Sequence, residues 1–247
     1  MSEKNYFAGK IHDLIRRQER GEGMVFSSFL TAEEADEAAR ICRAARAPFH
    51  LYGGYNEAER KMLAISDMDQ ETLRFCYPFS LISVEAYEPQ EISNRDILGA
   101  LMASGIRRDC LGDIIARDGI LLFFASEQIA DYLLENVDSI GRQGVVLKRQ
   151  EEGFLIPPPH FEEHRDTVAS LRLDAIVASF ARCSREQACK MIELGNVTVN
   201  HIQMDKKTKE IAAGERIVIR GRGKWIIDEC AGHSKKGRII IKARKYI

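Results

Sequence analysis

Several features that would identify a chemistry at once are missing from the 247-residue sequence. No apolar run approaches the roughly 20 residues that span a bilayer, so no membrane span is expected. The six cysteines include no Cys-x-x-Cys pair and no closely spaced histidine, which argues against zinc and redox motifs. No glycine-rich phosphate loop occurs either. We therefore expect neither a metal nor another cofactor.

The amino-terminal segment also lacks the apolar core of a signal peptide. It reads MSEKNYFAGKIHDLIRRQERG, which is polar and has helical periodicity. Scattered, unpaired cysteines are typical of proteins kept in a reducing compartment. Both observations predict a cytoplasmic protein.

Charge is divided unevenly along the chain, although the whole sequence carries only −1. Residues 165–247 contain 18 Lys and Arg against 9 Asp and Glu, a net charge of +9. Residues 1–164 contain 18 against 28, a net charge of −10. A basic module beside an acidic one is typical of a protein that binds a polyanion and stays soluble. A chance fluctuation of surface charge is the alternative.

Pattern and composition divide the chain into four parts. Residues 1–75 are predicted to form a helical region, with helices over 3–20 and 31–47. The predicted parts that follow are a middle domain over 76–152, a proline-rich linker over 153–164 and a carboxy-terminal domain over 165–247. The linker contains three consecutive prolines, which favour an extended, stiff spacer.

The middle domain is predicted to follow a β-α-β-β-α-β order. FSLISVEAY alternates like a strand, and SNRDILGALMASG reads as a capped amphipathic helix. Asp118-Gly119 is a strong hairpin signal, and Ser126 is expected to cap the next helix before a last strand, GVVLKRQ. This order is the ferredoxin-like layout that the common RNA-recognition fold uses.

The third strand of the middle domain is poorly suited to stacking bases. RNA-recognition folds stack bases on exposed aromatic side chains of this strand. Here the strand reads GILLFFA, and alternation sends Phe123 and Phe124 to opposite faces. We expect core packing for both, and poor base binding by the middle domain if it binds bases at all.

The carboxy-terminal domain begins with signals for two short helices and a strand. Leu173 and Phe180 bound an apolar face with helical spacing. Ser184 and Gln187 form a capping box for the second helix, and Gly195 supplies its left-handed stop. VTVN then alternates like a strand.

The segments RLD, SREQA, IELGNVTVN and AAGERIVIRGRGKW together resemble the S-four RNA-binding domain, named after a primary-binding protein of the small ribosomal subunit. The chain departs from the family pattern at two positions. His201 stands where the family usually turns on glycine, and Glu215 replaces the usual aspartate. Histidine tolerates left-handed backbone better than most residues, so no loss of the fold is expected.

GGYNEAERKM and RDILGALMASGIRRDCLGDI extend the resemblance over nearly the whole chain, to the bacterial YlmH-type family. The resemblance implies an α+β protein with a helical amino-terminal segment, a ferredoxin-like or RRM-like middle domain and an S-four-type α-L domain. It also implies an RNA-binding protein without known catalysis, associated with ribosomes and related to factors that handle peptidyl-tRNA on stalled large subunits, with a link to cell division. The implied partners are structured rRNA or tRNA and the large ribosomal subunit. The acidic front half is expected to contact protein.

Basic side chains on the S-four helices and the following strand are implied to bind structured RNA. Arg172 and Arg185 rank first, because the family pattern places arginine there and a guanidinium suits phosphate geometry. Lys190 has the alternative of an i,i+4 ion pair with Glu186 on a solvated face. Trp225 is expected in the core. The full set of predicted RNA-binding residues is Arg172, Arg182, Arg185, Lys190, Asn200, His201, Lys206, Lys207, Arg220, Arg222, Lys224, Lys235, Lys236, Arg238 and Lys242, with Arg244 on the same strand face as the last two.

Two other functions compete with non-catalytic RNA binding. One is an RNA-modifying enzyme, such as a pseudouridine synthase that uses its S-four domain for targeting. The only RLD, Arg172 to Asp174, lies in the binding module, and the two nucleotide-binding signatures of tRNA synthetases are absent. The other is a division factor that binds only protein. The sequence favours a non-enzymatic RNA-binding protein.

Overall fold

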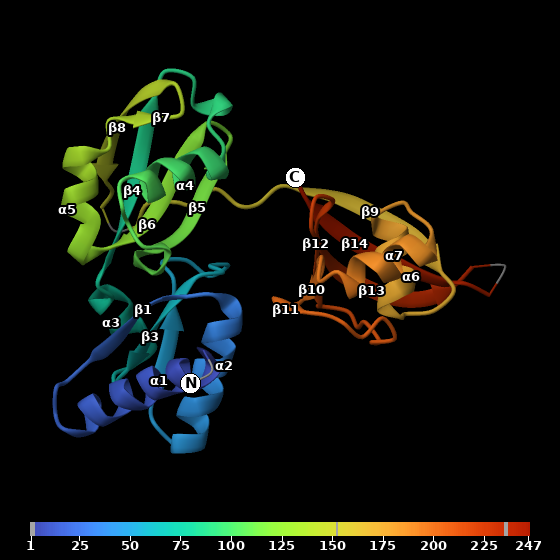
Figure 1. The fold of residues 1–247 in the computed structure, drawn as a ribbon, viewed down its shortest axis with the longest axis horizontal. Coiled ribbons are helices and arrows are strands. Elements are labelled where there is room, and N and C mark those ends of the chain that lie inside the picture. Colours follow the sequence, from blue (N-terminus) through green and yellow to red (C-terminus); the bar gives the residue numbers. More distant parts are fainter. Residues whose placement is uncertain (1–2, 152, 235–236) are drawn as a thin grey trace. The chain divides into compact units, whose positions relative to one another are not determined.

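The computed structural model describes residues 3–151, 153–234 and 237–247. It divides into two compact units, Met1–Pro157 and Pro158–Ile247. Both units combine helices with antiparallel sheets, which confirms the predicted mixed class (Figure 1). Within the described residues, no helix has the length and apolar character needed to cross a membrane.

The first unit contains three helices and a three-stranded sheet, followed by a β-α-β-β-α-β domain with one extra short strand. In chain order its helices and strands are α1 (Glu3–Glu19), β1 (Val25–Leu30), α2 (Ala32–Ala45), β2 (Phe49–Tyr52), β3 (Lys61–Ile65), α3 (Gln70–Leu73), β4 (Phe79–Ala86), α4 (Asn94–Ala103), β5 (Leu111–Arg117), β6 (Ile120–Ser126), α5 (Glu127–Asn136), β7 (Ser139–Ile140) and β8 (Gln143–Arg149).

The amino-terminal region is only partly helical. The predicted helices are present as α1 and α2, and Thr31 caps α2 in a capping box with Glu34. Strands β1, β3 and β2, which were not predicted from the sequence, form an antiparallel sheet beside them. The pairing of β1 slips between Phe26 and Phe29, and such a bulge breaks the two-residue alternation by which a strand is recognised.

The middle domain has the predicted ferredoxin-like topology. Its sheet has the order β5-β6-β4-β8-β7, with antiparallel neighbours throughout. Asp118 and Gly119 both have positive φ, as a tight hairpin turn requires. Ser126 occupies the cap position of α5, as predicted, although its side chain makes no capping hydrogen bond.

The two sheets of the first unit pack face to face. Phe29 and Met62 from the amino-terminal sheet share a core with Leu122 and Phe124 from the middle sheet. Separate cores join each sheet to its own helices, so the unit has four layers in the order helix, sheet, sheet, helix. Phe123 and Phe124 are 0% and 3% exposed, which confirms core packing for both. The sheet face that RNA-recognition folds use for stacking is therefore covered.

A partly buried polar network joins the layers of the first unit. The Asp113 carboxylate, on β5, accepts hydrogen bonds from the Tyr55 hydroxyl at 2.8 Å and from the backbone N–H groups of Glu59 and Arg60 at 2.7 and 2.9 Å. Burial raises the pKa of Asp113 despite these donors. The GGYNEAERKM segment thus has a structural role, because it attaches the amino-terminal sheet to the middle domain.

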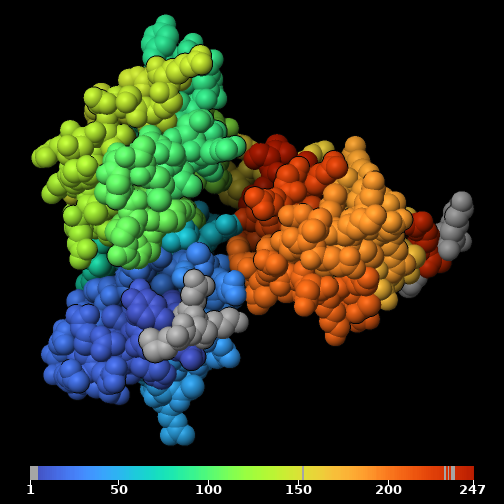
Figure 2. Space-filling view, viewed as in Figure 1, coloured from blue at the N-terminus to red at the C-terminus, as the bar shows by residue number. Residues whose placement is uncertain are grey.

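The second unit packs two helices on one face of a six-stranded sheet of order β11-β10-β12-β13-β14-β9. In a space-filling view of the side shown in Figure 1, the side chains of the helices cover the strands behind them (Figure 2). In chain order the elements are β9 (Phe161–Val168), α6 (Leu173–Phe180), α7 (Arg185–Glu193), β10 (Val197–Val199), β11 (Ile202–Gln203), β12 (Arg216–Ile219), β13 (Gly223–His233) and β14 (Ile239–Tyr246).

The predicted turn and cap signals of the second unit are confirmed. Ser184 and Gln187 form the capping box of α7, and Gly195 has a left-handed φ of 71°. Asn200 and His201 connect β10 to β11 with φ values of 50° and 69°, so His201 adopts the left-handed conformation for which the family uses glycine.

Strand β9 begins inside the segment predicted as a linker. Its residues pair with β14 from Phe161 opposite Tyr246 to Val168 opposite Ile239. The extended spacer therefore ends earlier than residue 164. The sequence FEEHRDTV contains few apolar residues because β9 is an edge strand with much of its surface exposed.

Candidate nucleic-acid interface

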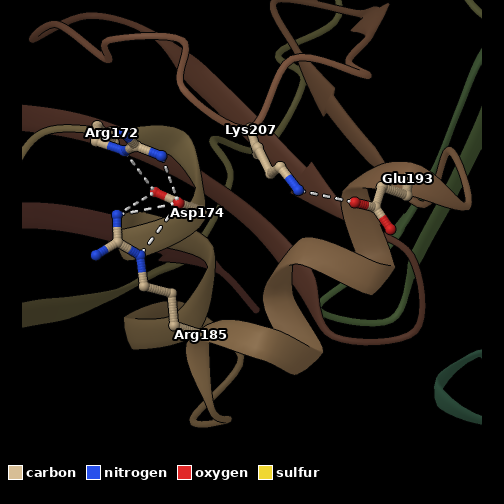
Figure 3. A network of polar contacts seen from close by, with 5 residues as sticks. All are labelled: Arg172, Asp174, Arg185, Glu193 and Lys207. Atoms are coloured by element: carbon tan, nitrogen blue, oxygen red, sulfur yellow. Dashed lines mark hydrogen bonds and ion pairs between the residues drawn. The ribbon is translucent and has the colours of Figure 1, made fainter.

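A buried aspartate holds two predicted RNA-binding arginines together (Figure 3). Asp174, in the first turn of α6, is 2% exposed. Its carboxylate accepts hydrogen bonds from Nε and Nη2 of Arg172 at 3.2 and 2.9 Å, and from Nε and Nη2 of Arg185 at 3.1 Å each. Arg172 comes from the loop before α6 and Arg185 from the start of α7. The pairing therefore ties the two helices together at this end.

Both guanidinium groups remain available to a second acceptor. A guanidinium has five N–H donors, and each arginine uses two on Asp174. The Arg172 and Arg185 side chains are 38% and 51% exposed. The cluster thus presents two oriented guanidinium groups to solvent, which is the geometry that pairs well with phosphate oxygens.

The Asp174 carboxylate is ionised at neutral pH. Burial by itself raises the pKa of Asp174, but the hydrogen bonds from Arg172 and then Arg185 outweigh burial and hold this pKa below its usual value. Two positive groups against one negative group leave the cluster with a net charge of +1. This charge favours an anionic ligand.

A lysine-containing loop covers the start of α6. The backbone carbonyls of Lys209 and Lys207 accept hydrogen bonds from the N–H groups of Leu173 and Asp174, at 2.8 and 3.1 Å. The Lys207 ammonium also pairs with Glu193, at the end of α7, at 3.0 Å (Figure 3). These contacts fix the loop next to the two arginines, and Lys206 lies exposed in the same loop.

Several other predicted contacts have structural roles or acidic partners. Lys190 pairs with Glu186 at 2.9 Å on the exposed side of α7, which is the alternative that the sequence left open. Lys242 pairs with Glu229 at 2.6 Å, and Arg244 pairs with Asp228, so acidic residues of β13 neutralise much of the predicted basic ribbon. Arg238 donates to the carbonyl of Thr167.

The predicted turn residues stabilise the hairpin between β10 and β11. The Asn200 side-chain oxygen accepts a hydrogen bond from the backbone N–H of Arg216 at 2.9 Å. A His201 ring nitrogen lies 3.3 Å from the Arg216 guanidinium. Asn200 and His201 thus have a structural role in the turn that is independent of RNA binding.

The predicted residues do not form a single surface. Alternation along β13 places Lys224 on the face opposite Trp225, which is 2% exposed and belongs to the core beneath the helices, as predicted. The Lys224 ammonium lies 4.4 Å from the Tyr246 ring centre, and burial lowers the pKa of Lys224 to about 8. Arg220 is exposed in the turn between β12 and β13. Lys235 and Lys236 lie outside the described residues.

Arg182 and Arg222 lie together although they are far apart in the sequence. Both line a cavity at the end of α6, with Lys245 from β14 as a third cation. Lys245 was not among the predicted residues, because its contribution depends on the pairing of β14 with β9. Asp174 was also missed as a site residue, although its place two residues after Arg172 in the RLD motif was a signal.

Thiol and metal chemistry find little support in the described residues. All six cysteines are free. Across residues 3–151, 153–234 and 237–247, no group of three His, Cys, Asp or Glu side chains is arranged to hold a metal ion. The second unit therefore offers cations, amides and backbone groups as its binding chemistry.

Comparisons with known proteins give three related matches. Residues 78–152 match the model of the family described as "Putative RNA-binding domain in YlmH". The chain is 29% identical, over 225 residues, to "Ribosome-associated protein quality control protein P2" of Bacillus subtilis, an alignment that covers 87% of this chain and 84% of the relative. A solved structure, "Cell division protein ylmH from Streptococcus pneumoniae", has a TM-score of 0.53 at 16% identity and covers 61% of this chain and 93% of that one.

These matches agree on one family. The matched domain coincides with the ferredoxin-like middle of the first unit, and the curated relative aligns over most of the sequence. The solved structure supports the fold. The predicted resemblance to the bacterial YlmH-type family is therefore confirmed.

Proposed function

We propose that the chain binds structured RNA through its second unit, as an S-four-type domain, and that Arg172 and Arg185 contact RNA phosphates. The observation that carries this proposal is the buried Asp174, which orients both guanidinium groups and leaves donors on each of them. Orienting the donors before binding reduces the entropy lost when a phosphate is bound.

Charge supports the same unit as the RNA-binding part. Residues 158–247 contain 18 Lys and Arg against 11 Asp and Glu, a net charge of +7, whereas residues 1–157 contain 18 against 26, a net charge of −8. A-form RNA exposes its phosphates and 2′-hydroxyls more than its base edges. Recognition is accordingly expected to depend on shape and backbone charge.

The RNA is proposed to be ribosomal or transfer RNA on the large ribosomal subunit in the cytoplasm. The name of the Bacillus subtilis relative supports a role in ribosome-associated quality control. The pneumococcal protein of similar fold is named for cell division, so a division role is kept as a secondary proposal.

Crosslinking followed by sequencing of the bound RNA tests this assignment, with co-sedimentation of the protein with ribosomal particles beside it. Enrichment of ribosomal or transfer RNA is the expected result. Recovery of protein partners without RNA would favour the division factor instead.

RNA binding is proposed to occur without chemical transformation. A pseudouridine synthase needs a catalytic aspartate in its own domain, but the aspartate of the RLD motif is buried and occupied by two arginines. Incubating the protein with ribosomal RNA should leave every uridine unchanged in an isomerisation assay. Turnover in that assay would reverse the assignment.

The acidic first unit is proposed to contact protein or to position the basic unit on a ribosomal particle. Its match to a domain described as RNA-binding makes RNA the alternative partner. The amino-terminal sheet covers the face of the middle sheet on which RNA-recognition folds stack bases. If the first unit contacts RNA, it would therefore have to use another surface.

A further inference from the structure

A polar cavity of about 360 Å³ lies in the second unit beside the end of α6. Binding pockets for small ligands begin at about 300 Å³, so the cavity suits one small polar group. Several segments contribute its lining, which consists of Glu162 and His164 from β9, Phe180 to Arg182 at the end of α6, Arg222 from the turn before β13, Trp225 from β13 and Lys245 from β14.

The cavity concentrates positive charge. Arg182 and Arg222 make no hydrogen bond or ion pair through their guanidinium groups with any part of the chain that the structure describes. The Lys245 ammonium lies 5.6 Å from the Trp225 ring centre. Three cations against the single carboxylate of Glu162 leave an excess of positive charge, and a concave wall strengthens its attraction for an anion.

The backbone of Arg182 supports a ligand-binding role. Arg182 follows the cap of α6 with a φ of 50°, a left-handed conformation that glycine usually supplies at helix ends. This conformation is unfavourable for a residue with a side chain, because Cβ then lies too close to the following carbonyl oxygen. Residues held in such conformations by the surrounding structure cluster at ligand sites.

His164 contributes a polar atom that lacks a partner. Its Nε2 is shielded from solvent and has no hydrogen-bond partner among the described residues. The ring packs edge-on against Phe180 at a centroid distance of 5.3 Å. His164 also lines the cavity, so its ring lies close to any ligand bound there.

We propose that this cavity binds one ribose-phosphate unit of RNA. Arg182, Arg222 and Lys245 would bind the phosphate, and the Glu162 carboxylate would accept a hydrogen bond from a ribose hydroxyl. The base is not read, because Phe180 and Trp225 are 6% and 2% exposed and stack on each other at 5.1 Å. That RNA supplies this ribose-phosphate rests on the proposed function, whereas binding of a nucleotide in the cavity can be tested without RNA.

The test is a titration of the full chain with cytidine 5′-monophosphate. Trp225 is the only tryptophan and lines the cavity, so its fluorescence reports binding there directly. The ring signals of His164 in NMR spectra give a second, independent readout. A saturable change in both signals is expected, and cytidine without a phosphate should produce neither change.

Substitutions separate the cavity from general charge effects. Arg222→Gln and Lys245→Gln should each weaken nucleotide binding about tenfold, since each removes a charged contact to phosphate. Arg165→Gln is the matched control, because Arg165 lies on the opposite face of β9 from His164 and carries the same charge. Glu162→Leu should abolish any preference for the ribonucleotide over its 2′-deoxy form, because it removes the acceptor for the ribose hydroxyl.

The outcomes distinguish this inference from the proposed function. Displacement of the bound nucleotide by ribosomal RNA would support RNA as the ligand of the cavity. Nucleotide binding that ribosomal RNA does not reduce would overturn RNA as that ligand. Unchanged Trp225 and His164 signals would overturn the proposal that the cavity binds a ribose-phosphate. Equal effects of Arg165→Gln and Arg222→Gln on nucleotide binding would overturn it as well. If the chain binds the nucleotide but not RNA in a separate assay, the cavity stands and the proposed function fails.

Discussion

Among individual residues, Asp174 determines how the predicted arginines are used. Burial of a carboxylate is costly unless it is paired and hydrogen-bonded, and Arg172 and Arg185 both satisfy it. The same pairs orient the arginines toward solvent. One aspartate therefore links the stability of the helix pair to the geometry of the proposed phosphate site.

Asp174→Asn is predicted to weaken RNA binding about fivefold to tenfold although it makes the chain more positive. Charge alone predicts tighter binding, whereas loss of the charge-assisted hydrogen bonds leaves Arg172 and Arg185 less ordered. Fluorescence anisotropy with a structured ribosomal RNA fragment measures the effect. Tighter binding by this variant would remove Asp174 as a positioning residue.

Lys224→Met is predicted to stabilise the second unit at neutral pH. Burial lowers the folded-state pKa of Lys224 to about 8, so the charged ammonium costs stability below that pH. Between pH 8 and the unfolded value of about 10.4 the unfolded chain binds more protons, and stability rises with pH. Urea unfolding followed by Trp225 fluorescence should show a gain at pH 7 that shrinks by pH 9.5. A gain independent of pH would contradict this account.

At the scale of elements, β9 is predicted to be necessary for the second unit to fold. It pairs with β14 over its whole length, and Asp166 accepts a hydrogen bond from the Ser179 hydroxyl of α6. It also provides one wall of the cavity. A fragment cut at residue 165 would divide this strand.

Fragments of the second unit test the role of β9. Residues 158–247 are predicted to unfold cooperatively, whereas residues 169–247 should lose the cooperative transition and associate, because the edge of β14 is then exposed. Circular dichroism during heating and size-exclusion chromatography measure both properties. Equal behaviour of the two fragments would show that β9 is dispensable.

Asp113 provides the corresponding test for the first unit. Asp113→Ala is predicted to lower the free energy of unfolding by about 3 kcal/mol, since it leaves the Tyr55 hydroxyl and two backbone N–H groups without their acceptor. Asp36→Ala, on the exposed side of α2, is the control. Chemical unfolding followed by circular dichroism measures the difference, and equal effects of the two substitutions would contradict the network.

Local signals in the sequence predicted the elements that depend on local contacts. The Asp118-Gly119 hairpin and the Ser184 capping box formed as expected, because each is determined by a few neighbouring residues. Strands β1 and β9 were missed because a bulge interrupts one and charged residues fill the other. Both are stabilised by pairing with distant strands.

The candidate site shows the same division between local and tertiary information. Residue type and family pattern predicted Arg172, Arg182, Arg185 and Arg222. The sharing of Asp174 between two arginines and the meeting of Arg182 with Arg222 arise from tertiary packing. The acidic partners of Lys190 and Lys242 likewise limit which predicted cations remain available.

At the scale of the whole molecule, the two units differ in both charge and architecture. The first is acidic, and its two sheets cover each other. The second is basic and presents Arg172, Arg182, Arg185, Arg222 and Lys206 with donors not used within the described structure. We therefore assign RNA affinity to about five cations of the second unit.

The salt dependence of RNA binding by the full chain tests this assignment most directly. If Arg172, Arg185 and Lys206 each neutralise one phosphate and the cavity of Arg182 and Arg222 neutralises a fourth, the logarithm of affinity should fall with the logarithm of salt concentration at a slope of about −2.8 to −3.6. Replacing Arg172 and Arg185 together by Gln should reduce the slope by about 1.4 to 1.8, while Arg165→Gln should leave it unchanged. A slope near zero, or one that the double substitution does not alter, would contradict the account.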